Sequence, residues 1–332
     1  MAETVFAGID IGGTKCAITI GPDPQTVVKK KIIPTNHDVP VDVFIEHLME
    51  ETEKLIASIG GDGTPSIQRI GVVCGGPLDL KRGRICSPPN LPGWDDVEIV
   101  RILESRFNVH VLLQNDADAS AVAEWSFGAG VGCATMVFLT FGTGMGAGLI
   151  INGELYRGAS NSAGEVGRIR LSEPNMREGC DGTFEGYCSG NGIARRARAL
   201  ARIQFETTGA GPLYCPTLEG IADVSARTVA DAARAADPFA VEIFEETAER
   251  LGSALATILD ILNPSRIVIG GVYARCQDLL EKTTLATMKD LSDAHAYNAC
   301  SVVSCGLGET VGDVAALSVA TGLLQIDEEA VS

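Results

Sequence analysis

The chain has 332 residues, of which 45% are hydrophobic and 21% charged, and its formal net charge is −17. This length fits about two domains, and the composition is typical of a globular protein with a sizeable core. The acidic excess argues against a surface for nucleic acid or for an anionic membrane. No apolar run approaches the roughly 18 residues that span a bilayer, and no basic segment with a cleavage site opens the chain. We therefore expect a cytoplasmic protein with no nucleic-acid or membrane partner.

The short β-rich runs alternate with amphipathic helical stretches, which is the pattern of an α/β protein. Strands are expected at 5–11, 15–21, 27–34, 69–76, 109–115, 134–142, 146–153, 266–271 and 301–305. Helices are expected at 41–60, 94–107, 116–128 and 239–262, from about 274, and at about 311–325. The ten cysteines form no C-x-x-C pair and lie mostly in apolar surroundings, so we expect reduced, buried thiols.

One internal repeat stands out. Residues 5–21, VFAGIDIGGTKCAITIG, align without a gap with residues 137–153, VFLTFGTGMGAGLIING. Each copy reads as a strand, a glycine turn and a second strand. A single copy is an ordinary β-hairpin, but two copies in a chain of two-domain length predict a duplicated core with a cleft between its halves.

The first glycine turn lies in IDIGGTK. Phosphate oxygens require several backbone N–H donors at close range, and Gly12 and Gly13 permit such a turn. Thr14 and Lys15 add a hydroxyl and a positive charge. Asp10, at the end of its strand, is placed to hold a hydrated Mg²⁺ beside the phosphates. The loop matches neither the P-loop nor the Rossmann pattern.

The second glycine turn, FGTGMGAG, contains more glycine than a plain hairpin needs. Gly142 and Gly144 offer backbone donors, and Thr143 adds a hydroxyl. A glycine-rich turn without a ligand is the alternative for each loop. Two such loops at equivalent points of a repeat predict a phosphate site with one loop from each half.

A third candidate follows an apolar strand, where the chain reads LLQNDADAS. A helix cap alone explains Asn or Asp at this point. The functional alternative is that Asp116, at the carboxyl end of a strand, acts as general base toward a substrate hydroxyl. Asn115 would then hydrogen-bond the substrate.

These motifs together resemble the ROK family of bacterial sugar kinases, open reading frames and sugar-responsive repressors. The resemblance covers essentially the whole chain through the following segments: IDIGGTK, Asn115-Asp116-Ala117, FGTGMGAG, NGELYRGASNSAGEVG (152–167), FEGYCSG (184–190), IVIGG (267–271) and LGETVGDVAALSVA (307–320). It implies the actin-like, ribonuclease-H-like ATPase fold, with two α/β domains around a cleft. We expect an N-terminal domain at 1–117, to which the helix at about 311–325 returns, and a larger C-terminal domain at 118–310.

The resemblance also implies the roles of single residues. Asp116 corresponds to the base that takes the proton from the primary hydroxyl of a hexose as it attacks the γ-phosphate of ATP. The sugar-binding residues it implies are Asn90, Asn115, Glu165 and Glu185. The nucleotide-binding residues it implies are Asp10, Gly12, Gly13, Thr14, Lys15, Gly142, Thr143, Gly144, Gly270 and Gly271. The last two match the turn that meets adenosine, and Mg²⁺ accompanies the nucleotide. A homodimer is the implied assembly.

The sequence departs from the family at its structural zinc. The family shows E-x-G-H and then C-x-C-G-x-x-G-C-x-E, whose histidine and three cysteines bind the metal. Aligned on its glycines, this chain has Arg168, Met176, Glu178 and Thr183 at those four positions. A tetrahedral zinc site of this kind uses four N or S ligands, and none of the four remains, so we expect no zinc. Cys180 falls at a position that is not a ligand.

Of the four residues that replace the family's zinc ligands, Arg168 is the one expected to lie nearest the sugar. Arginine is permanently charged and only donates hydrogen bonds. It would pair with Glu165 or Glu185, reach an anionic group or ring oxygen of a different sugar, or point into solvent.

Three functions remain to be compared. The first is ATP-dependent phosphorylation of a hexose such as glucose, with an N-acetylhexosamine (N-acetylglucosamine or N-acetylmannosamine) or fructose as the alternative acceptor. The second is a sugar-sensing regulator, but the first phosphate hairpin begins at once and leaves no room for a preceding DNA-binding domain. The third is a catalytically idle sugar sensor, against which the intact Asp10, Asp116 and glycine loops argue. Polyphosphate or another phosphoryl donor stays open beside ATP.

Overall fold

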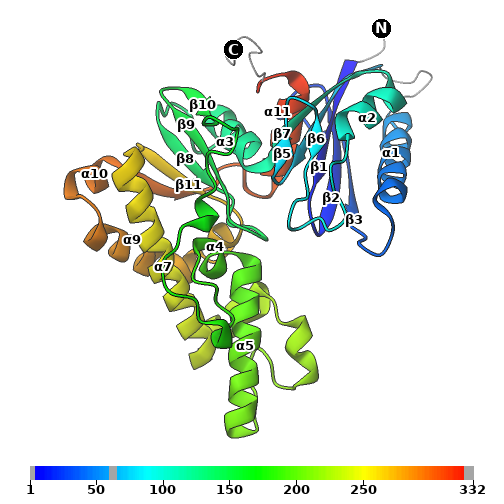
Figure 1. Cartoon of the computed structure of the whole chain (residues 1–332). Helices are drawn as coiled ribbons and strands as arrows, with labels where there is room; N and C mark the ends of the chain where they lie inside the picture. Colours follow the sequence, from blue (N-terminus) through cyan, green and yellow to red (C-terminus); the bar gives the residue numbers. More distant parts are fainter. Residues whose placement is uncertain (1–3, 60–65, 325–332) are drawn as a thin grey trace. The chain divides into compact units, whose positions relative to one another are not determined.

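The computed structural model describes residues 4–59 and 66–324 of the chain, and Figure 1 labels its helices and strands. Contacts between residues divide the chain into two compact units. The first unit contains the chain up to Gly128, the short segment Gly158–Ser162 and the chain from Glu309. The second contains Ala129–Arg157 and Ala163–Gly308.

The elements of the first unit are β1 (Thr4–Ile11), β2 (Lys15–Gly21), β3 (Lys29–Pro34), α1 (Val41–Ala57), β4 (Ser66–Cys74), β5 (Leu78–Asp79), β6 (Arg84–Ile85), α2 (Ile99–Phe107), β7 (His110–Asn115), α3 (Asp116–Phe127) and α11 (Val311–Thr321). The elements of the second unit are β8 (Met136–Leu139), β9 (Ala147–Ile151), β10 (Glu154–Tyr156), α4 (Phe184–Tyr187), α5 (Gly190–Thr208), α6 (Ala226–Arg234), α7 (Pro238–Leu262), β11 (Arg266–Ile269), α8 (Val272–Arg275), α9 (Gln277–Leu291), α10 (Ala294–Ala299) and β12 (Ser301–Ser304). Short 3₁₀ turns at Val166–Arg168, Met176–Glu178, Glu219–Asp223 and Gly308–Thr310 complete the described chain.

Each unit is built on a five-stranded sheet, and the two sheets have the same topology. The strand orders are β3-β2-β1-β4-β7 and β10-β9-β8-β11-β12. In each sheet the first hairpin is antiparallel, and its first strand pairs in parallel with the next strand, β4 or β11. The duplicated core predicted from the repeat is confirmed by this shared order.

The gapless alignment of the two hairpins is wrong beyond their turns. Phe6 pairs with Gly21 in the first hairpin, so the alignment would pair Phe138 with Gly153. The structure pairs Phe138 with Gly148 instead. The second turn runs from Thr140 to Gly146 and is closed by a hydrogen bond from the Thr140 N–H to the Gly146 carbonyl (3.0 Å). It is longer than the first turn, and this length shifts the register.

Helix α11 joins the end of the chain to the first unit, where it packs against β1, β4 and α3. The packing is close because the strands present glycine to it. A Cβ at Gly8 would lie 2.7 Å from the Cβ of Ala316, and one at Gly71 would overlap the backbone of Ala320. Helix α3 also belongs to this unit, so the division falls at Gly128 and not at residue 117.

Two sequence-based expectations for helices differ from the structure. The helix expected at 94–107 begins only at Ile99, because Asp96 has φ +55° and Val97 forms an antiparallel β-bridge with Ile85. No helix or strand was predicted between 153 and 239, where the structure has β10, α4, α5 and α6. No helix within the described ranges is both long and apolar enough to cross a membrane.

Candidate active site

Three parallel strands of the first unit end at the same edge of its sheet. Ile11 of β1 pairs with Cys74 of β4, and Cys74 pairs with Asn115 of β7. Asp10 therefore lies one residue before this edge, and Asp116 directly after it. Open α/β sheets bind ligands at the carboxyl ends of their strands, so the two predicted carboxylates lie where a ligand is expected.

A third carboxylate, which the sequence analysis did not identify, lies beside Asp10. Helix α11 begins next to β1, and a Cβ at Gly312 would come 3.0 Å from the Asp10 Oδ2. The following residue, Asp313, is 5% exposed and accepts hydrogen bonds from Thr19 Oγ1 (2.9 Å) and Lys30 Nζ (2.6 Å). Burial, helped by the charges of Asp116 and Asp313, raises the pKa of Asp10 to about 7.

We expect the free energy of unfolding to fall as the pH rises from about 4 to above 7, relative to an Asp10→Asn variant. The ordinary pKa of Asp is 3.8 and the folded value is about 7, so the folded chain binds more protons in this interval. A raised folded pKa contributes stability at low pH that is lost as the pH rises through it. Urea unfolding of both proteins between pH 4.5 and 8.5 measures the difference. Parallel pH profiles for the two proteins would contradict the raised pKa.

Asn115 and Asp116 begin helix α3. Asn115 is its N-cap, and its Oδ1 accepts from the N–H groups of Ala117 (2.9 Å) and Asp118 (3.2 Å). The oxygen of Asn115 is thus used by the helix, and its amide nitrogen is the group left for a substrate. Asp116 Oδ1 also accepts from the Ala117 N–H (2.9 Å), and its Oδ2 faces the Cα of Gly75, where a Cβ would lie 3.8 Å away. The N-cap role explains why asparagine stands at position 115. It does not explain why a carboxylate stands at position 116.

Hydrogen bonds to its carbonyl groups hold the first glycine loop in place. Thr35 Oγ1 donates to the Gly12 carbonyl (2.6 Å), and His37 Nε2 lies 2.7 Å from the Gly13 carbonyl. Thr14 and Lys15 are exposed. The loop also meets the predicted sugar residue Asn90, because a Cβ at Gly13 would overlap the Asn90 backbone. The structure therefore brings Asn90 against the phosphate-loop candidate.

The second glycine loop is the meeting point of several elements of the second unit. The Gly190 N–H, at the start of α5, donates to the Gly142 carbonyl (2.8 Å). The Val272 N–H, at the start of α8, donates to the Phe141 carbonyl (2.7 Å). Thr143 is exposed. The loop is thus held through its carbonyls, and the Thr143 hydroxyl faces solvent.

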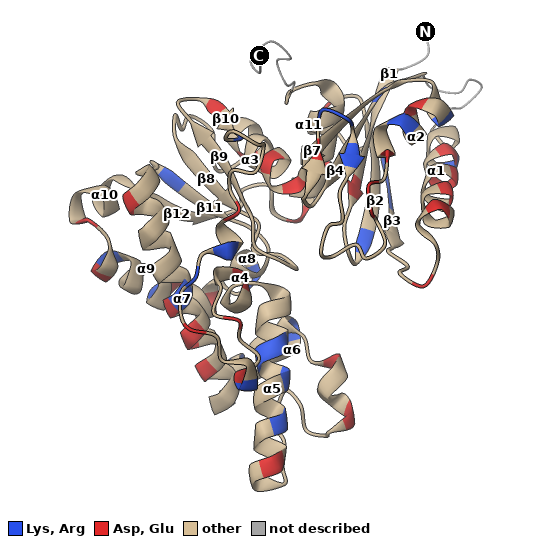
Figure 2. Cartoon of the chain, in the orientation of Figure 1, with Lys and Arg blue, Asp and Glu red and all other residues tan. Residues whose placement is uncertain are grey.

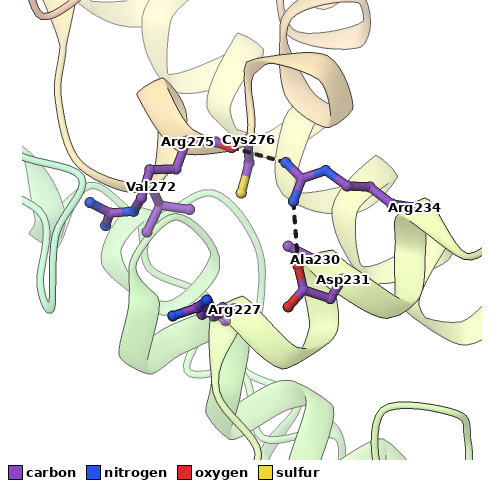
Figure 3. Close-up of a pocket in the computed structure, with 8 residues that line it drawn as sticks. Arg227, Ala230, Asp231, Arg234, Val272, Arg275 and Cys276 are labelled. Carbon is purple, nitrogen blue, oxygen red and sulfur yellow. Dashed lines mark hydrogen bonds and ion pairs between the residues drawn. The ribbon is translucent and has the colours of Figure 1, made fainter. Parts of the chain in front are cut away.

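The turn Gly270-Gly271 packs directly on this loop. Gly271 has φ +63° and ψ −121°, which L-residues disfavour, and a Cβ there would overlap the Phe141 carbonyl. A cavity of about 550 Å³ begins just after this turn. Its lining comes from α6 and from the segment 272–276, and Figure 3 shows the guanidinium groups around it. The lining residues are Ala226, Arg227, Ala230, Asp231, Arg234, Val272, Arg275 and Cys276.

Several hydrogen bonds hold the side chain of Arg234 in the lining of this cavity. It donates to Asp278 through Nε and Nη2 (both 2.8 Å) and to the Arg275 carbonyl through Nη2 (2.9 Å). Asp231 lies 3.7 Å from its Nη1. This lining could not be predicted from the sequence, because no motif distinguishes the arginines of α6 from ordinary surface charges.

The three remaining predicted sugar residues lie in the second unit. Glu165 caps the 3₁₀ turn Val166–Arg168, and Glu165, Arg168 and Glu185 are all exposed. Glu185 Oε2 accepts from the Met145 N–H (2.9 Å), which ties Glu185 to the second glycine loop. Neither Glu165 nor Glu185 pairs with Arg168, and the Arg168 guanidinium donates no hydrogen bond and forms no ion pair within the described ranges.

Comparison with known proteins identifies the chain's relatives. The sequence pattern of the ROK family matches residues 6–322. The chain belongs to the ROK family. A glucokinase of Halalkalibacterium halodurans is 31% identical over 288 residues, which cover 85% of this chain and 84% of that protein. An N-acetylgalactosamine kinase of Shewanella sp. strain ANA-3 is 31% identical over 291 residues, covering 87% and 88%.

Among solved structures, a ROK family glucokinase from Streptomyces griseus in complex with glucose and AMPPNP has a TM-score of 0.76 and 27% sequence identity. The match covers 96% of this chain and 99% of that one. The ROK membership and these whole-chain matches make the chain a sugar kinase with the actin-like ATPase fold, as the resemblance implied.

Proposed function

We propose that this ROK kinase transfers the γ-phosphoryl group of ATP to the primary hydroxyl of a hexose, with Asp116 as the general base. The observation that supports this most directly is the position of Asp116 at the strand edge, in the same unit as Asp10 and the first glycine loop. The relatives named glucokinase and the glucose and AMPPNP bound to the similar structure favour glucose and ATP.

In this proposal Asp116 accepts the hydroxyl proton as the sugar oxygen bonds to the γ-phosphorus. The bond from that phosphorus to the β–γ bridging oxygen breaks, and ADP leaves with this oxygen. General-base catalysis of this kind contributes about 10²- to 10⁴-fold to rate. The remaining acceleration comes from positioning and from stabilising the charge on the phosphoryl oxygens.

The residues around Asp10 fit a magnesium ion. Mg²⁺ prefers hard oxygen ligands and is usually held through one or two carboxylates, waters and substrate phosphates. Asp10 is half-buried, the charges of Asp116 and Asp313 help to raise its pKa, and the mutual repulsion of these carboxylates would be relieved by a divalent cation. Asp10 would hold the ion, directly or through water. When bound, Mg²⁺ neutralises charge on the donor's phosphates.

For the phosphates of the nucleotide we assign Gly12, Gly13, Thr14 and Lys15, together with Gly142, Thr143 and Gly144. The N–H groups of Gly12 and Gly142 donate within their own turns, to the carbonyls of Lys15 (3.1 Å) and Gly144 (2.9 Å), so these two glycines shape the loops. The other residues would supply the backbone N–H groups, hydroxyls and charge. We assign the adenosine end of the nucleotide to the Gly270-Gly271 turn and the cavity that follows it. The exposure of Thr14 and Thr143 supports the assignment of the two loops to the phosphates. The close contact between the Gly270-Gly271 turn and the second loop supports the assignment of this turn to adenosine.

The sugar would be bound through Asn90, Asn115, Glu165 and Glu185, with Arg168 as a further donor. An N-acetylhexosamine is the second candidate acceptor, because a kinase of N-acetylgalactosamine matches the chain as closely in identity as a glucokinase does. Arg168 replaces the family histidine in this region, so it is the residue we expect to separate the two acceptors.

A coupled ADP-release assay with a panel of hexoses and N-acetylhexosamines tests the proposal. We expect turnover with at least one sugar, dependent on added Mg²⁺ and absent without sugar. ADP release with none of the sugars would exclude the proposed reaction and favour a sugar-sensing regulator. Replacing ATP by polyphosphate in the same assay identifies the donor.

A further inference from the structure

The segment 164–188 contains Glu165, Arg168 and Glu185 but does not fit the zinc ion that its family implies. The guanidinium of Arg168 is permanently protonated and cannot ligate a metal. Met176 and Glu178 are exposed, and the hydroxyl of Thr183 is already used in hydrogen bonds. In the described ranges no three His, Cys, Asp or Glu side chains lie close enough to hold a metal ion. Something other than zinc must fix this segment.

Thr183, at the position of the family's third cysteine, joins Asp181 to helix α4. Its hydroxyl donates to Asp181 Oδ1 (2.7 Å) and accepts from the Gly186 N–H (3.0 Å), and its own N–H donates to Asp181 Oδ1 (3.0 Å). Helix α4 begins at Phe184 and contains Glu185. These hydrogen bonds therefore determine where the Glu185 backbone lies.

Arg195 of α5 connects this turn to a long helix. Its Nε donates to the Gly179 carbonyl (2.7 Å) and its Nη2 to Asp181 Oδ2 (2.9 Å). Burial raises the pKa of Asp181, but the Thr183 hydrogen bonds and the Arg195 charge outweigh it and lower the pKa overall, so Asp181 stays ionised. A planar guanidinium can make both hydrogen bonds at once in one fixed geometry. We call Asp181, Thr183 and Arg195 the Asp181 network.

The other end of α4 is fixed by Tyr187. The guanidinium carbons of Arg196 of α5 and Arg250 of α7 each lie 4.9 Å from the centroid of its ring. Both arginines pair with Glu246 of α7, and Figure 2 shows basic residues along α5 and acidic residues along α7. The Tyr187 hydroxyl lies 2.9 Å from Ser172 Oγ, within the same segment. Both ends of α4 are thus held by protein side chains.

We propose that the Asp181 network fixes the segment 164–188, which the family fixes with zinc. We further propose that Asp181, Thr183 and Arg195 are positioning residues for sugar recognition by Glu185. The network holds the start of α4, and the Glu185 carboxylate reaches the Met145 N–H from there. The sugar-binding part rests on the proposed function. The metal-independent fixing of the segment does not.

The test compares Arg195→Gln and Thr183→Val with Arg177→Gln. Arg177 lies in the same segment, is exposed and has no ion pair within the described ranges, so it controls for loss of a positive charge. We expect Arg195→Gln and Thr183→Val to speed amide hydrogen exchange across 179–187 by about tenfold, since each removes hydrogen bonds that hold this turn. We expect both to raise the sugar KM by about fivefold, with kcat and the ATP KM changed less than about twofold. Arg177→Gln should match the wild type.

Zinc content is measured on the same proteins. We expect well below one equivalent of zinc in the wild type, with exchange rates and sugar KM unchanged by a chelator. One equivalent of zinc, or exchange in both variants equal to that of the control, would overturn the network. Faster exchange with an unchanged sugar KM would overturn the positioning role. If the wild type phosphorylates no sugar, the proposed function fails, and the exchange and zinc measurements still decide the network.

Discussion

The Asp116→Asn variant is expected to lose about a thousandfold in kcat while staying folded, because a positioned general base contributes about 10²- to 10⁴-fold. The amide oxygen of asparagine can still accept from the Ala117 N–H, as Asp116 Oδ1 does at 2.9 Å. It cannot take the proton of the sugar hydroxyl. The loss should therefore appear in kcat, with sugar binding retained in equilibrium measurements.

Asp42→Asn is the matched control. Asp42 lies in the first turn of α1 as Asp116 lies in the first turn of α3, and both helices belong to the first unit. The same chemical change at the same kind of helix position should leave kcat within about twofold, since effects at the helix terminus cost only tenths of a kcal/mol. Wild-type kcat in Asp116→Asn, or an equal loss in both variants, would remove Asp116 as the base.

The Gly271→Ala variant is expected to lower Tm by roughly 5–10 °C and to raise the ATP KM more than about tenfold. A side chain at φ +63° and ψ −121° is strained, and the new Cβ would overlap the Phe141 carbonyl. The backbone must therefore move away from the second glycine loop and break the hydrogen bond from the Val272 N–H to Phe141 (2.7 Å). Thermal unfolding and nucleotide titration measure both effects.

The Gly209→Ala variant is the control, because it introduces backbone strain without a steric clash. Gly209 lies in the same unit, has φ +76° at the end of α5, and no atom lies within 4 Å of the position of its Cβ. Its cost is the left-handed conformation alone, about 1 kcal/mol, so Tm should fall by only a few degrees and the ATP KM should not change. Equal changes in Tm and in the ATP KM of the two variants would mean that the contact between the Gly270-Gly271 turn and the second glycine loop affects neither stability nor nucleotide binding.

The sequence predicted the two sheets well because their signals are local. Each hairpin has a largely apolar run on either side of a glycine turn, and each turn lies at the end of a strand. Asp10 and Asp116 were found for the same reason, since a carboxylate directly at a strand end is visible in the sequence. The register of the second hairpin was not predicted, because it depends on how the backbone of its longer turn closes.

Features that join distant parts of the chain were missed. Asp313 lies within the apolar helix α11, and only the fold brings Lys30 and Thr19 to it. A buried acidic residue among apolar neighbours was the available signal. The helices between 153 and 239 were also missed, although α5 begins at a Ser189 cap and ends at Gly209, and α6 begins with a capping box at Ser225. Their buried faces consist mainly of alanine, which marks an apolar face in the sequence less clearly than Leu, Ile or Val does.

The position of the phosphoryl group on the sugar decides whether the chain transfers it to the primary hydroxyl. Purified protein is incubated with ATP, Mg²⁺ and the sugar that the ADP-release assay selects, and the product is analysed by ³¹P and ¹³C nuclear magnetic resonance. We expect one ADP for each sugar monophosphate, with phosphorus coupled to the carbon of the primary hydroxyl. A phosphate on the anomeric carbon or a secondary hydroxyl, or ADP formed without sugar phosphate, would exclude phosphoryl transfer to the primary hydroxyl.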